Sequence, residues 1–445
     1  MKRKTLVLLI IFLSALSLSS KAQALDVTAA NLELATVQAA CDQVTAAGGG
    51  TVYLPAGTSP WWTGNLKLMG GVNLIGAGSP MTTRDADGRW IPAPTTVLRS
   101  AVSYMQGIIF VNSPWHTQPP RYTGFRISGI RFLGSDGTTT VMNIIAIREG
   151  APNFRIDHCE IDNGSYQISI GSSRTEATPT SVGVIDHCNI INSRDYGVSV
   201  GQRPWIENKP LGTGDAVYVE DCYFENFVSH PVAGFCGAHW VVRYNKFLQR
   251  PGGPGFAWLD VHGPGWCDPA PQHGGGPWEV YNNTFISDPT LSTLNWSPMR
   301  LRSLHGVIFN NHFQNFRHAA NFTCDAGSCS AGLDAPGRSG SYTPGIYIWN
   351  NTYTNVVPDT DGMYWIEPGC CAGVYTRYDY EVFGYNDGIG SDHGVPKPGY
   401  TPYTYPHPLT LEDIPLKGDV NSDKAVNILD VQALVNHILG IQDYG

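Results

Sequence analysis

Four polar residues on two short stretches of the chain could carry out proton chemistry. Asp260 and His262 stand two positions apart, as do Arg300 and Arg302. A neutral imidazole can take a proton at mild pH, and a guanidinium can stabilise the negative charge that develops beside a carboxylate. We therefore predict His262 as a general base, Arg300 and Arg302 as cationic clamps, and Asp260 as a metal ligand or the group that orients His262.

Both stretches have the sequence pattern of a short strand that ends near a His–Gly pair. These pairs are His262–Gly263 and His305–Gly306. If they occupy equivalent places on adjacent strands, Asp260 and His262 lie beside Arg300 and Arg302. Alternation along a strand sends Arg300 and Arg302 to the same face.

Aromatic residues and one more histidine accompany these four residues. They are Trp258, Trp266, His273 and Trp296. Exposed aromatic faces would provide platforms for sugar rings, whereas packing beneath long loops would give the tryptophans a structural role. We predict these residues as substrate-binding, with the packing role as the alternative.

A repeat of 23 to 40 residues indicates the elements that must position these groups. Eight segments align without gaps, and they begin at Phe125, Phe154, Gly183, Val217, Trp240, Trp278, Gly306 and Ile346. One column is aliphatic: Ile127, Ile156, Ile185, Val219, Val242, Val280, Ile308 and Ile348. A second is bulky and mostly aromatic: Phe132, Ile161, Ile190, Phe224, Phe247, Phe285, Phe313 and Tyr353. Between them a column changes from Ile130, Cys159, Cys188 and Cys222 to Asn245, Asn283, Asn311 and Asn351.

Stacked coils explain these three columns. Equivalent residues of successive coils lie about 4.8 Å apart, so that aliphatic columns fill a continuous core and each coil needs its neighbours. Asn side chains at a turn can satisfy one another from coil to coil, and Cys residues pack as small buried groups. The pattern predicts an all-β fold, a single-stranded right-handed parallel β-helix, with insertions placed in loops.

The N-terminal part adds a resemblance to a known superfamily. An amphipathic helix over Leu32–Ala47 precedes a glycine turn, the stretch TVYLPAG (51–57) and the stretch VNLIGAG (72–78), and IDHC occurs at 156–159 and 185–188. This order resembles the pectate-lyase-like β-helix superfamily over residues 25–383. The resemblance implies a β-helix with a short capping helix, and it leaves the reaction open among lyases, hydrolases, esterases, epimerases and non-enzymatic proteins.

Within that superfamily the polar cluster resembles the chondroitinase B and alginate lyase type. By position, His262 stands where that family has a Lys base, and Arg302 or Arg300 stands where it has an Arg. Asp260 is the one match to its acidic calcium ligands. This resemblance implies β-elimination on a polysaccharide that contains uronic acids.

Two alternatives to a lyase remain. A glycoside hydrolase needs paired carboxylates in one groove. Acidic residues on adjacent coils could supply them: Asp157, Asp186, Glu220, Asp221, Asp260 and Asp268. The signatures of polygalacturonases are absent, and the IDHC acids could instead belong to turns. The other alternative is a non-catalytic carbohydrate-binding surface protein.

The first 24 residues have the pattern of a cleavable signal peptide. Three basic residues within Met1–Lys4 precede an apolar core over Leu6–Leu18 and the small-residue exit Ala22-Gln23-Ala24. No later segment is a candidate membrane span. The formal net charge of -9 argues against a nucleic-acid partner, because such partners favour basic surfaces. We expect a secreted, extracellular monomer.

Cysteines beyond the stacked column have separate explanations. Cys41 is expected to be buried on the N-terminal helix. Loop cysteines could form the disulfides Cys236–Cys267 and Cys324–Cys329 in an oxidising compartment. For the adjacent Cys370 and Cys371 the sequence leaves the oxidation state undecided.

The C-terminus contains a candidate calcium loop. We divide the mature chain into a β-helix domain (25–395), a stiff exposed Pro/Tyr-rich linker (396–416) and a final module (417–445). Oxygen ligands recur there at loop spacing suited to calcium: Asp419, Asn421, Asp423, the carbonyl of Ala425, Asn427 and Asp430. The loop and the following helix resemble one of the two repeats of a dockerin. The resemblance implies Ca²⁺ as cofactor and a cohesin-bearing scaffold as a candidate partner.

Overall fold

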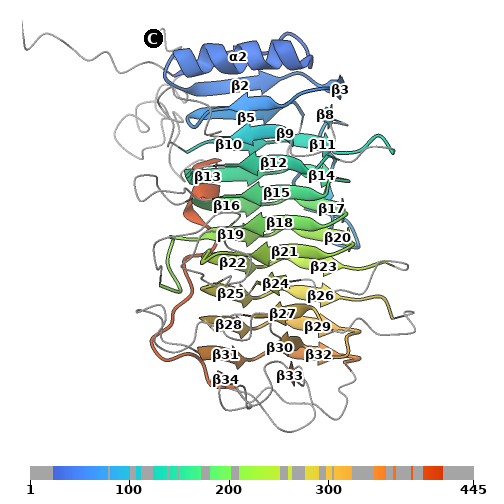
Figure 1. Cartoon of the computed structure of the whole chain (residues 1–445), viewed down its shortest axis with the longest axis vertical. Coiled ribbons are helices and arrows are strands. Elements are labelled where there is room, and N and C mark those ends of the chain that lie inside the picture. The colour runs from blue at the N-terminus through green and yellow to red at the C-terminus, as the bar shows by residue number, and fades with distance from the viewer. Residues whose placement is uncertain are drawn as a thin grey trace, which may run out of the picture.

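The protein forms stacked coils along one axis. The computed structural model describes residues 24–78, 81–100, 107–111, 124–137, 141–148, 150–171, 181–201, 210–250, 259–262, 276–289, 297–302, 305–322, 345–356, 364–366, 382–383 and 394–413. Helix α2 (Leu34–Ala46) covers the N-terminal end of the stack (Figure 1). The strands form three long parallel sheets, which confirms the predicted right-handed parallel β-helix.

The three sheets are called A, B and C in the order in which the repeated coils visit them. Sheet A contains, in spatial order, β1 (Leu25–Thr28), β2 (Gly50–Leu54), β5 (Val72–Gly76), β10 (Arg126–Ser128), β13 (Pro152–Asp157), β16 (Val182–Asp186), β19 (Val217–Glu220), β22 (Trp240–Arg243), β25 (Trp278–Tyr281), β28 (His305–Phe309), β31 (Gly345–Trp349) and β34 (Val382–Phe383). Sheet B contains β3 (Gly57–Trp62), β8 (Thr96–Ser100), β11 (Ile130–Leu133), β14 (Glu160–Asp162), β17 (Asn189–Ser193), β20 (Tyr223–Phe227), β23 (Lys246–Leu248), β26 (Thr284–Ile286), β29 (His312–Gln314) and β32 (Thr352–Thr354). Sheet C contains β4 (Leu66–Leu68), β9 (Gly107–Val111), β12 (Asn143–Ile147), β15 (Tyr166–Ile170), β18 (Tyr196–Val200), β21 (His230–Gly234), β24 (Leu259–Val261), β27 (Met299–Leu301), β30 (Ala320–Phe322) and β33 (Tyr364–Ile366).

The strand registers confirm the aliphatic and aromatic columns of the sequence. In sheet A, Ile127 pairs with Ile156, and the column continues in register to Ile348. In sheet B, Phe132 pairs with Ile161, and that column runs to Tyr353. Both columns face one continuous hydrophobic core, so the coils share a single interior.

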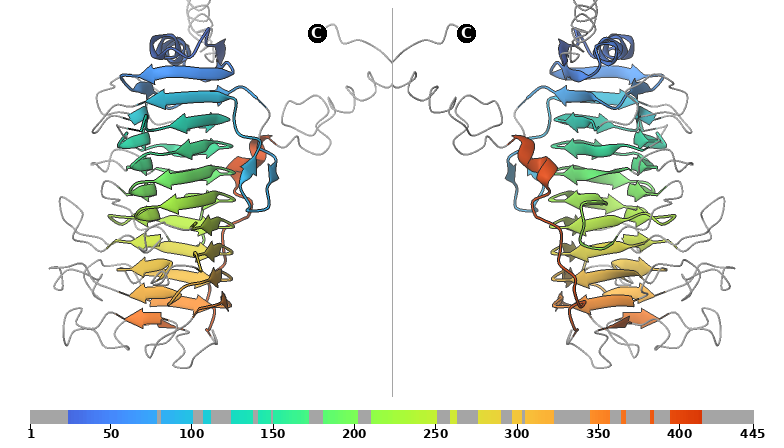
Figure 2. Two further views of the ribbon diagram at one scale, coloured as in Figure 1. Left: turned by 90° about the vertical axis from the view of Figure 1, so that its right-hand side faces the viewer. Right: turned by 90° about the vertical axis from the view of Figure 1, so that its left-hand side faces the viewer.

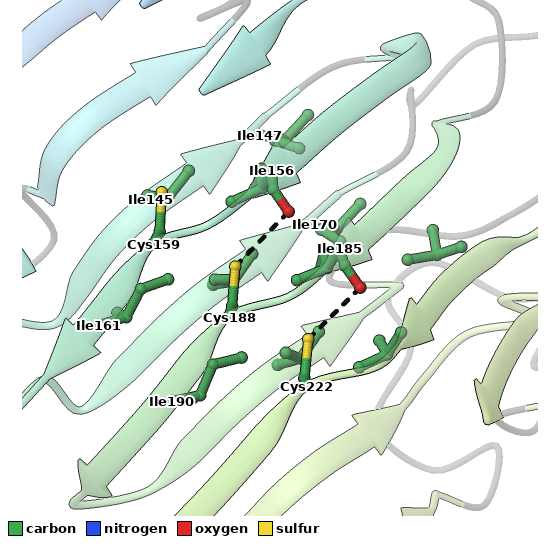
Figure 3. Packing of buried hydrophobic residues seen from close by; sticks show 14 of the residues in the cluster. Ile145, Ile147, Ile156, Cys159, Ile161, Ile170, Ile185, Cys188, Ile190 and Cys222 are labelled. Atoms are coloured by element: carbon green, nitrogen blue, oxygen red, sulfur yellow. Dashed lines mark hydrogen bonds between the residues drawn. The ribbon is translucent and has the colours of Figure 1, made fainter. Parts of the chain in front are cut away.

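At the turn between sheets A and B, the side chains of the cysteine column and of the asparagine column both donate hydrogen bonds to backbone carbonyls of the preceding coil. The thiols of Cys188 and Cys222 donate to the carbonyls of Ile156 and Ile185 on the preceding coil, at 3.6 and 3.5 Å (Figure 3). Asn245 donates to the equivalent carbonyl of Val219 at 2.8 Å. Burial raises the pKa of Cys188 well above its usual value, so the thiol keeps the proton that it donates.

The asparagine column adds acceptors that cysteine lacks. The backbone N–H groups of Asn245, Asn283 and Asn311 each donate to the side-chain oxygen of the next Asn, at 2.9–3.0 Å. Cys222 donates its N–H to Asn245 in the same way, at 2.9 Å. The two columns therefore join in one continuous chain of buried hydrogen bonds.

The turn before these columns explains the IDHC motif. His158, His187 and Asp221 precede the three cysteines and adopt φ values of 50°, 52° and 54°. Asn282 and Asn310 occupy the equivalent positions before the asparagines, with φ values of 57° and 54°. His, Asp and Asn are enriched in this left-handed region. The histidines of the IDHC motif are thus explained by the left-handed backbone conformation that this turn requires.

A C-terminal strap, residues 394–413, runs along the outer face of sheet A and ends in η2 (Pro408–Asp413), which lies against β13 and β16 (Figure 2). The strands β6 (Thr83–Arg84) and β7 (Trp90–Ile91) form a separate antiparallel hairpin. The sequence predicted a stiff exposed linker over most of the strap. In the structure, Arg243 donates to the carbonyls of Tyr403 and Thr404 at 2.8 and 2.9 Å. Tyr400, Tyr403 and Leu409 pack against a hydrophobic cluster on sheet A. The strap is therefore part of the β-helix body, although several of its side chains remain exposed.

Two further sequence predictions concern cysteines and membrane spans. Cys41 is buried and free, as expected. Cys236 is not among the free thiols of the described residues, but its predicted partner Cys267, like Cys324, Cys329, Cys370 and Cys371, lies outside them, so the pairings stay predictions. None of the helices in the described ranges is long and apolar enough to span a membrane.

Candidate functional site

The polar residues singled out in the sequence meet on the outer face of sheet C. Leu259 and Val261 of β24 are part of the hydrophobic core, so alternation turns Asp260 outward. Asp260 pairs in register with Arg300 of β27, as predicted. Arg302 donates its backbone N–H to Val261 at 3.0 Å, which places it beside His262.

Asp260 is the centre of a compact ionic cluster, which we call the Asp260 cluster: Asp260, Arg302, His262 and His230. The carboxylate is fully buried, and its Oδ2 lies 2.5 Å from Nη2 of Arg302. The Nε2 atoms of His262 and His230 each lie 3.0 Å from the same oxygen. One carboxylate thus organises three cationic or potentially cationic groups.

The electrostatics of the cluster favour an ionised carboxylate. Burial alone would raise the pKa of Asp260, but His262, His230 and Arg302 hold that pKa well below its usual value. Burial is the largest influence on His262 and lowers the pKa of its imidazole, with Asp260 opposing the change. At mild pH the geometry therefore supports an Asp260–Arg302 ion pair beside a neutral His262.

The contacts of His262 define its tautomer. Nη2 of Arg302 lies 2.6 Å from Nδ1 of His262, and a guanidinium nitrogen can only donate. Nδ1 must therefore carry the lone pair, and the proton of the neutral ring lies on Nε2, which faces Asp260. Because Arg302 already engages this lone pair, the structure favours a positioning role for His262 over the predicted role as base.

Arg300 and Arg302 differ in what holds them. Arg302 is almost fully buried and is held by Asp260 through Nε at 3.2 Å and Nη2 at 2.5 Å. Arg300 is half-buried on the outer face, and it forms no ion pair with any residue that the structure describes. Of the two predicted clamps, Arg302 is paired with Asp260, whereas Arg300 has no acidic partner among the described residues and could pair with the carboxylate of a ligand.

Aromatic side chains flank the Asp260 cluster on the coils that precede it. Tyr166 and Tyr196 are half-buried, pair in register on β15 and β18, and have ring centroids 4.8 Å apart. Tyr196 also lies 5.5 Å from the ring of His230, and Phe235 stacks on His262 at 3.9 Å. Burial and the nearby Asp195 raise the pKa of Tyr166 to about 12 and that of Tyr196 further, so both phenols stay protonated.

One expectation about the two His–Gly pairs is wrong. His305 begins β28 in sheet A, where it pairs with Gly345. His262 follows β24 in sheet C, and its equivalent on the next coil is Arg302. The two pairs look alike in sequence because the sheet A strand β28, which starts soon after β27, happens to begin with a histidine.

Other predicted site residues fall outside the described ranges. These are Trp258, Trp266, His273 and Trp296, and all calcium-loop residues, namely Asp419, Asn421, Asp423, Ala425, Asn427 and Asp430. Their roles stay predictions. Among the described residues no group of three or more His, Cys, Asp or Glu is placed to hold a metal ion. The orienting role of Asp260 is supported by its contact with Nε2 of His262 at 3.0 Å.

Four of the six carboxylates considered for a hydrolase lie on or beside sheet A, away from the Asp260 cluster. Asp157 accepts from Arg126 at 2.7 Å, and Asp186 accepts from Arg155 at 3.0 Å. Glu220 pairs with Arg243, and all three of these carboxylates are fully buried. Asp221 accepts a hydrogen bond from Tyr405 of the strap, and Asp268 lies outside the described residues. These acids stabilise the coil stack and its strap.

Sequence reasoning missed His230 and Tyr196. A signal for both was present: the segments YQISI, YGVSV and HPVAG follow the bulky column at nearly constant spacing, and Tyr166, Tyr196 and His230 begin them. Aligning this third strand of each coil would have placed His230 beside Tyr196.

Comparisons with known proteins add likenesses in fold. No family model and no curated protein matches the sequence. Among solved structures, an alginate lyase from Paenibacillus sp. str. FPU-7 is 13% identical, with a TM-score of 0.43 over 76% of this chain and 99% of that one. The tailspike protein of E. coli bacteriophage HK620, in complex with a pentasaccharide, is 14% identical, with a TM-score of 0.46 over 81% of this chain and 63% of that one. A tailspike protein from Acinetobacter baumannii bacteriophage Fri1, a capsular polysaccharide depolymerase, is 11% identical, with a TM-score of 0.36.

These likenesses are partial in extent. The chain covers 56% of the Fri1 tailspike chain and 61% of a chain from Geobacillus virus E2, so it spans about three-fifths of such proteins. Identities of this size assign no reaction to the chain, which has to be argued from its own residues.

Proposed function

We propose that this chain is an exported polysaccharide lyase, which cleaves a uronate-containing polysaccharide by β-elimination on the outer face of sheet C. The observation that carries the proposal is Arg300, a half-buried guanidinium next to the ionic Asp260 cluster, with no ion pair among the described residues. A stack of coils presents such side chains in a long row, and an extended polymer can lie across several coils.

The chemistry of elimination explains why this arrangement is suitable. The proton beside a uronate carboxylate is too weakly acidic to leave unless the developing negative charge is stabilised. A guanidinium placed on the carboxylate supplies that stabilisation in a partly dehydrated site. Arg300 is the candidate for this role, since Arg302 is held by Asp260 and orients the cluster.

The test measures the ultraviolet absorbance of the unsaturated product, beside a reducing-sugar assay, on a panel of uronate and neutral polysaccharides. We expect rising absorbance on a uronate polymer, and a drop in kcat/KM of about 100-fold in Arg300→Gln, the size typical for loss of one charge-stabilising group. Arg250→Ala is the control, because Arg250 forms a surface ion-pair network with Asp87 and Glu225. Reducing ends without absorbance would indicate hydrolysis, and silence in both assays with retained polymer binding would indicate a carbohydrate-binding protein.

A separate proposal concerns the final module and export. We propose that residues 417–445 bind Ca²⁺ through the predicted loop and that residues 1–24 are removed on export, with Cys236–Cys267 and Cys324–Cys329 oxidised afterwards. Calcium titration of the whole mature chain should protect the amides of residues 419–430 from hydrogen exchange, and this protection should be lost in Asp419→Ala. Unchanged exchange at millimolar calcium would contradict the loop, and calcium-dependent capture of a purified cohesin would test the dockerin resemblance.

A further inference from the structure

His407 caps the short helix that ends the strap. It directly precedes η2, and it is almost fully buried. Nδ1 of His407 accepts the backbone N–H of Leu409 at 3.2 Å, and the carbonyl of His407 accepts the N–H of Thr410 at 2.8 Å. Because Nδ1 uses its lone pair as an acceptor, the imidazole of the attached strap is neutral, with its proton on Nε2. The side-chain cap therefore exists only in the neutral form of His407.

Charged groups of four strands of sheet A lie close to His407. Arg243 of β22 donates to the strap carbonyls that precede it, and Arg155 of β13 donates to a carbonyl of η2 at 3.4 Å. Glu220 of β19 accepts the backbone N–H of His407 at 2.8 Å. Burial is the largest influence on the imidazole and, together with the two guanidinium groups, lowers the pKa of His407 to about 4, although Asp186 of β16 opposes the shift.

Two tyrosine rings complete the surroundings of His407. Tyr218 of β19 lies 4.8 Å from the imidazole and Tyr403 of the strap lies 5.6 Å from it. Burial raises the pKa of Tyr218 above its usual value, so its phenol is neutral. Tyr218 belongs to the hydrophobic cluster outside sheet A that the strap covers, and this cluster is separate from the continuous core (Figure 2). The strap can therefore separate while the coils stay stacked.

We propose that His407 is a pH-sensitive switch, whose protonation removes the cap, places a third cation beside Arg243 and Arg155, and releases the strap from sheet A. The strap connects the β-helix to residues 417–445, so its release frees this final module from the body. The switch is independent of the proposed reaction, because it lies on sheet A and the Asp260 cluster lies on sheet C.

The sign of the effect follows from the two states of the imidazole. In the released strap His407 has its ordinary pKa of 6.5, and in the attached strap its pKa is about 4. Attachment is therefore fully favoured above pH 6.5, and this advantage is lost as the pH falls from 6.5 towards 4. Between pH 7 and 4.5 the equilibrium constant for release should rise about 50-fold.

The experiment measures hydrogen exchange of the whole chain at pH 7 and 4.5, corrected for the pH dependence of free-amide exchange. The amides of Leu409 and Thr410 should lose about 50-fold in protection, while those of β15 on sheet C stay protected. His407→Asn should abolish most of this loss, because an Asn side-chain oxygen accepts an N–H two residues on and does not titrate. His312→Asn, the same substitution on sheet B, is the control and should behave as the wild type.

Equal protection of the wild-type strap at the two pH values would overturn the proposed switch. An equal loss of protection in His407→Asn would also overturn it and would assign the titration to another group, such as Glu220. If His407→Asn loses the strap already at pH 7, a nuclear magnetic resonance titration of the wild-type His407 imidazole decides the case. A ring that titrates well below pH 6.5 supports the switch, and one that titrates at pH 6.5 or above while the strap stays protected contradicts it. None of these outcomes bears on the proposed lyase reaction.

Discussion

Replacing Arg243 by Met should lower the free energy of unfolding by about 3–5 kcal/mol, the usual cost of removing one partner of a buried ion pair. Arg243 and Glu220 are both fully buried, and Nε of Arg243 lies 2.7 Å from the carboxylate. The guanidinium also donates to Tyr281 and to two strap carbonyls. Without it, these acceptors would lose their donor, and the buried Glu220 carboxylate would lose its charged partner and keep the backbone N–H of His407, at 2.8 Å.

The Arg243–Glu220 ion pair itself is expected to add far less to the free energy of unfolding than the substitution Arg243→Met removes. Burial raises the pKa of Glu220 even though Arg243 opposes the shift, which shows how costly it is to keep the carboxylate dehydrated. The double variant Glu220→Gln/Arg243→Met should therefore be more stable than Arg243→Met. Urea unfolding measures both, and limited proteolysis should show early cleavage within 394–413 in Arg243→Met. A double variant no more stable than the single one would contradict the account.

Replacing Asp260 by Asn should lower the free energy of unfolding at pH 7 by about 3 kcal/mol, because Arg302 would keep a buried charge without a carboxylate. The effect should depend on pH. Folding lowers the pKa of Asp260, so the ionised carboxylate stabilises the native protein above the pKa of about 4 that an unfolded-chain Asp has. This stabilisation is lost as the pH falls below about 4 towards the folded pKa.

The free-energy difference between wild type and Asp260→Asn should thus be largest near neutrality and shrink in acid. Urea unfolding at pH 7, 5 and 3.5 measures it. Asp87→Asn is the control: Asp87 pairs with Arg250 at the surface, and its removal should change stability much less at every pH. A difference that stays constant from pH 7 to 3.5 would mean that folding does not lower the pKa of Asp260, and a wild type that gains stability relative to the variant in acid would mean that folding raises that pKa.

The columns of the core were predictable because their period is long and their chemistry is uniform. Ile156 and Ile185, or Phe247 and Phe285, are equivalent by sequence and pair in register in the structure. Every coil needs its neighbours to bury these side chains, so a change of residue type or of strand register in one coil would expose the hydrophobic core. The switch from Cys222 to Asn245 was also visible, and the structure adds the reason: both side chains donate to the preceding coil.

The part of the candidate site that could be predicted lies on the two short stretches with the apolar pattern of a strand, which contain Asp260 and Arg300. Asp260 does pair with Arg300, but this pairing was inferred from the two His–Gly pairs, which do not occupy equivalent places in the structure. The role of Arg302 could not be predicted, because the sequence does not show that the guanidinium is nearly fully buried against Asp260. His230 was missed since it lies 30 residues from Asp260 along the chain, and only the coil stacking brings them together.

The C-terminal strap changes how the stack should come apart. Coils that touch only their neighbours can fray from either end, one repeat at a time. Here one covalent segment contacts Trp349 near one end, Glu279 and Arg243 midway, and Arg155 near the other. Loss of any one coil would strain the anchors on the others, so amides of sheet A from β13 to β31 should exchange together in a single cooperative opening. A linear array thereby gains the all-or-none behaviour of a globular domain.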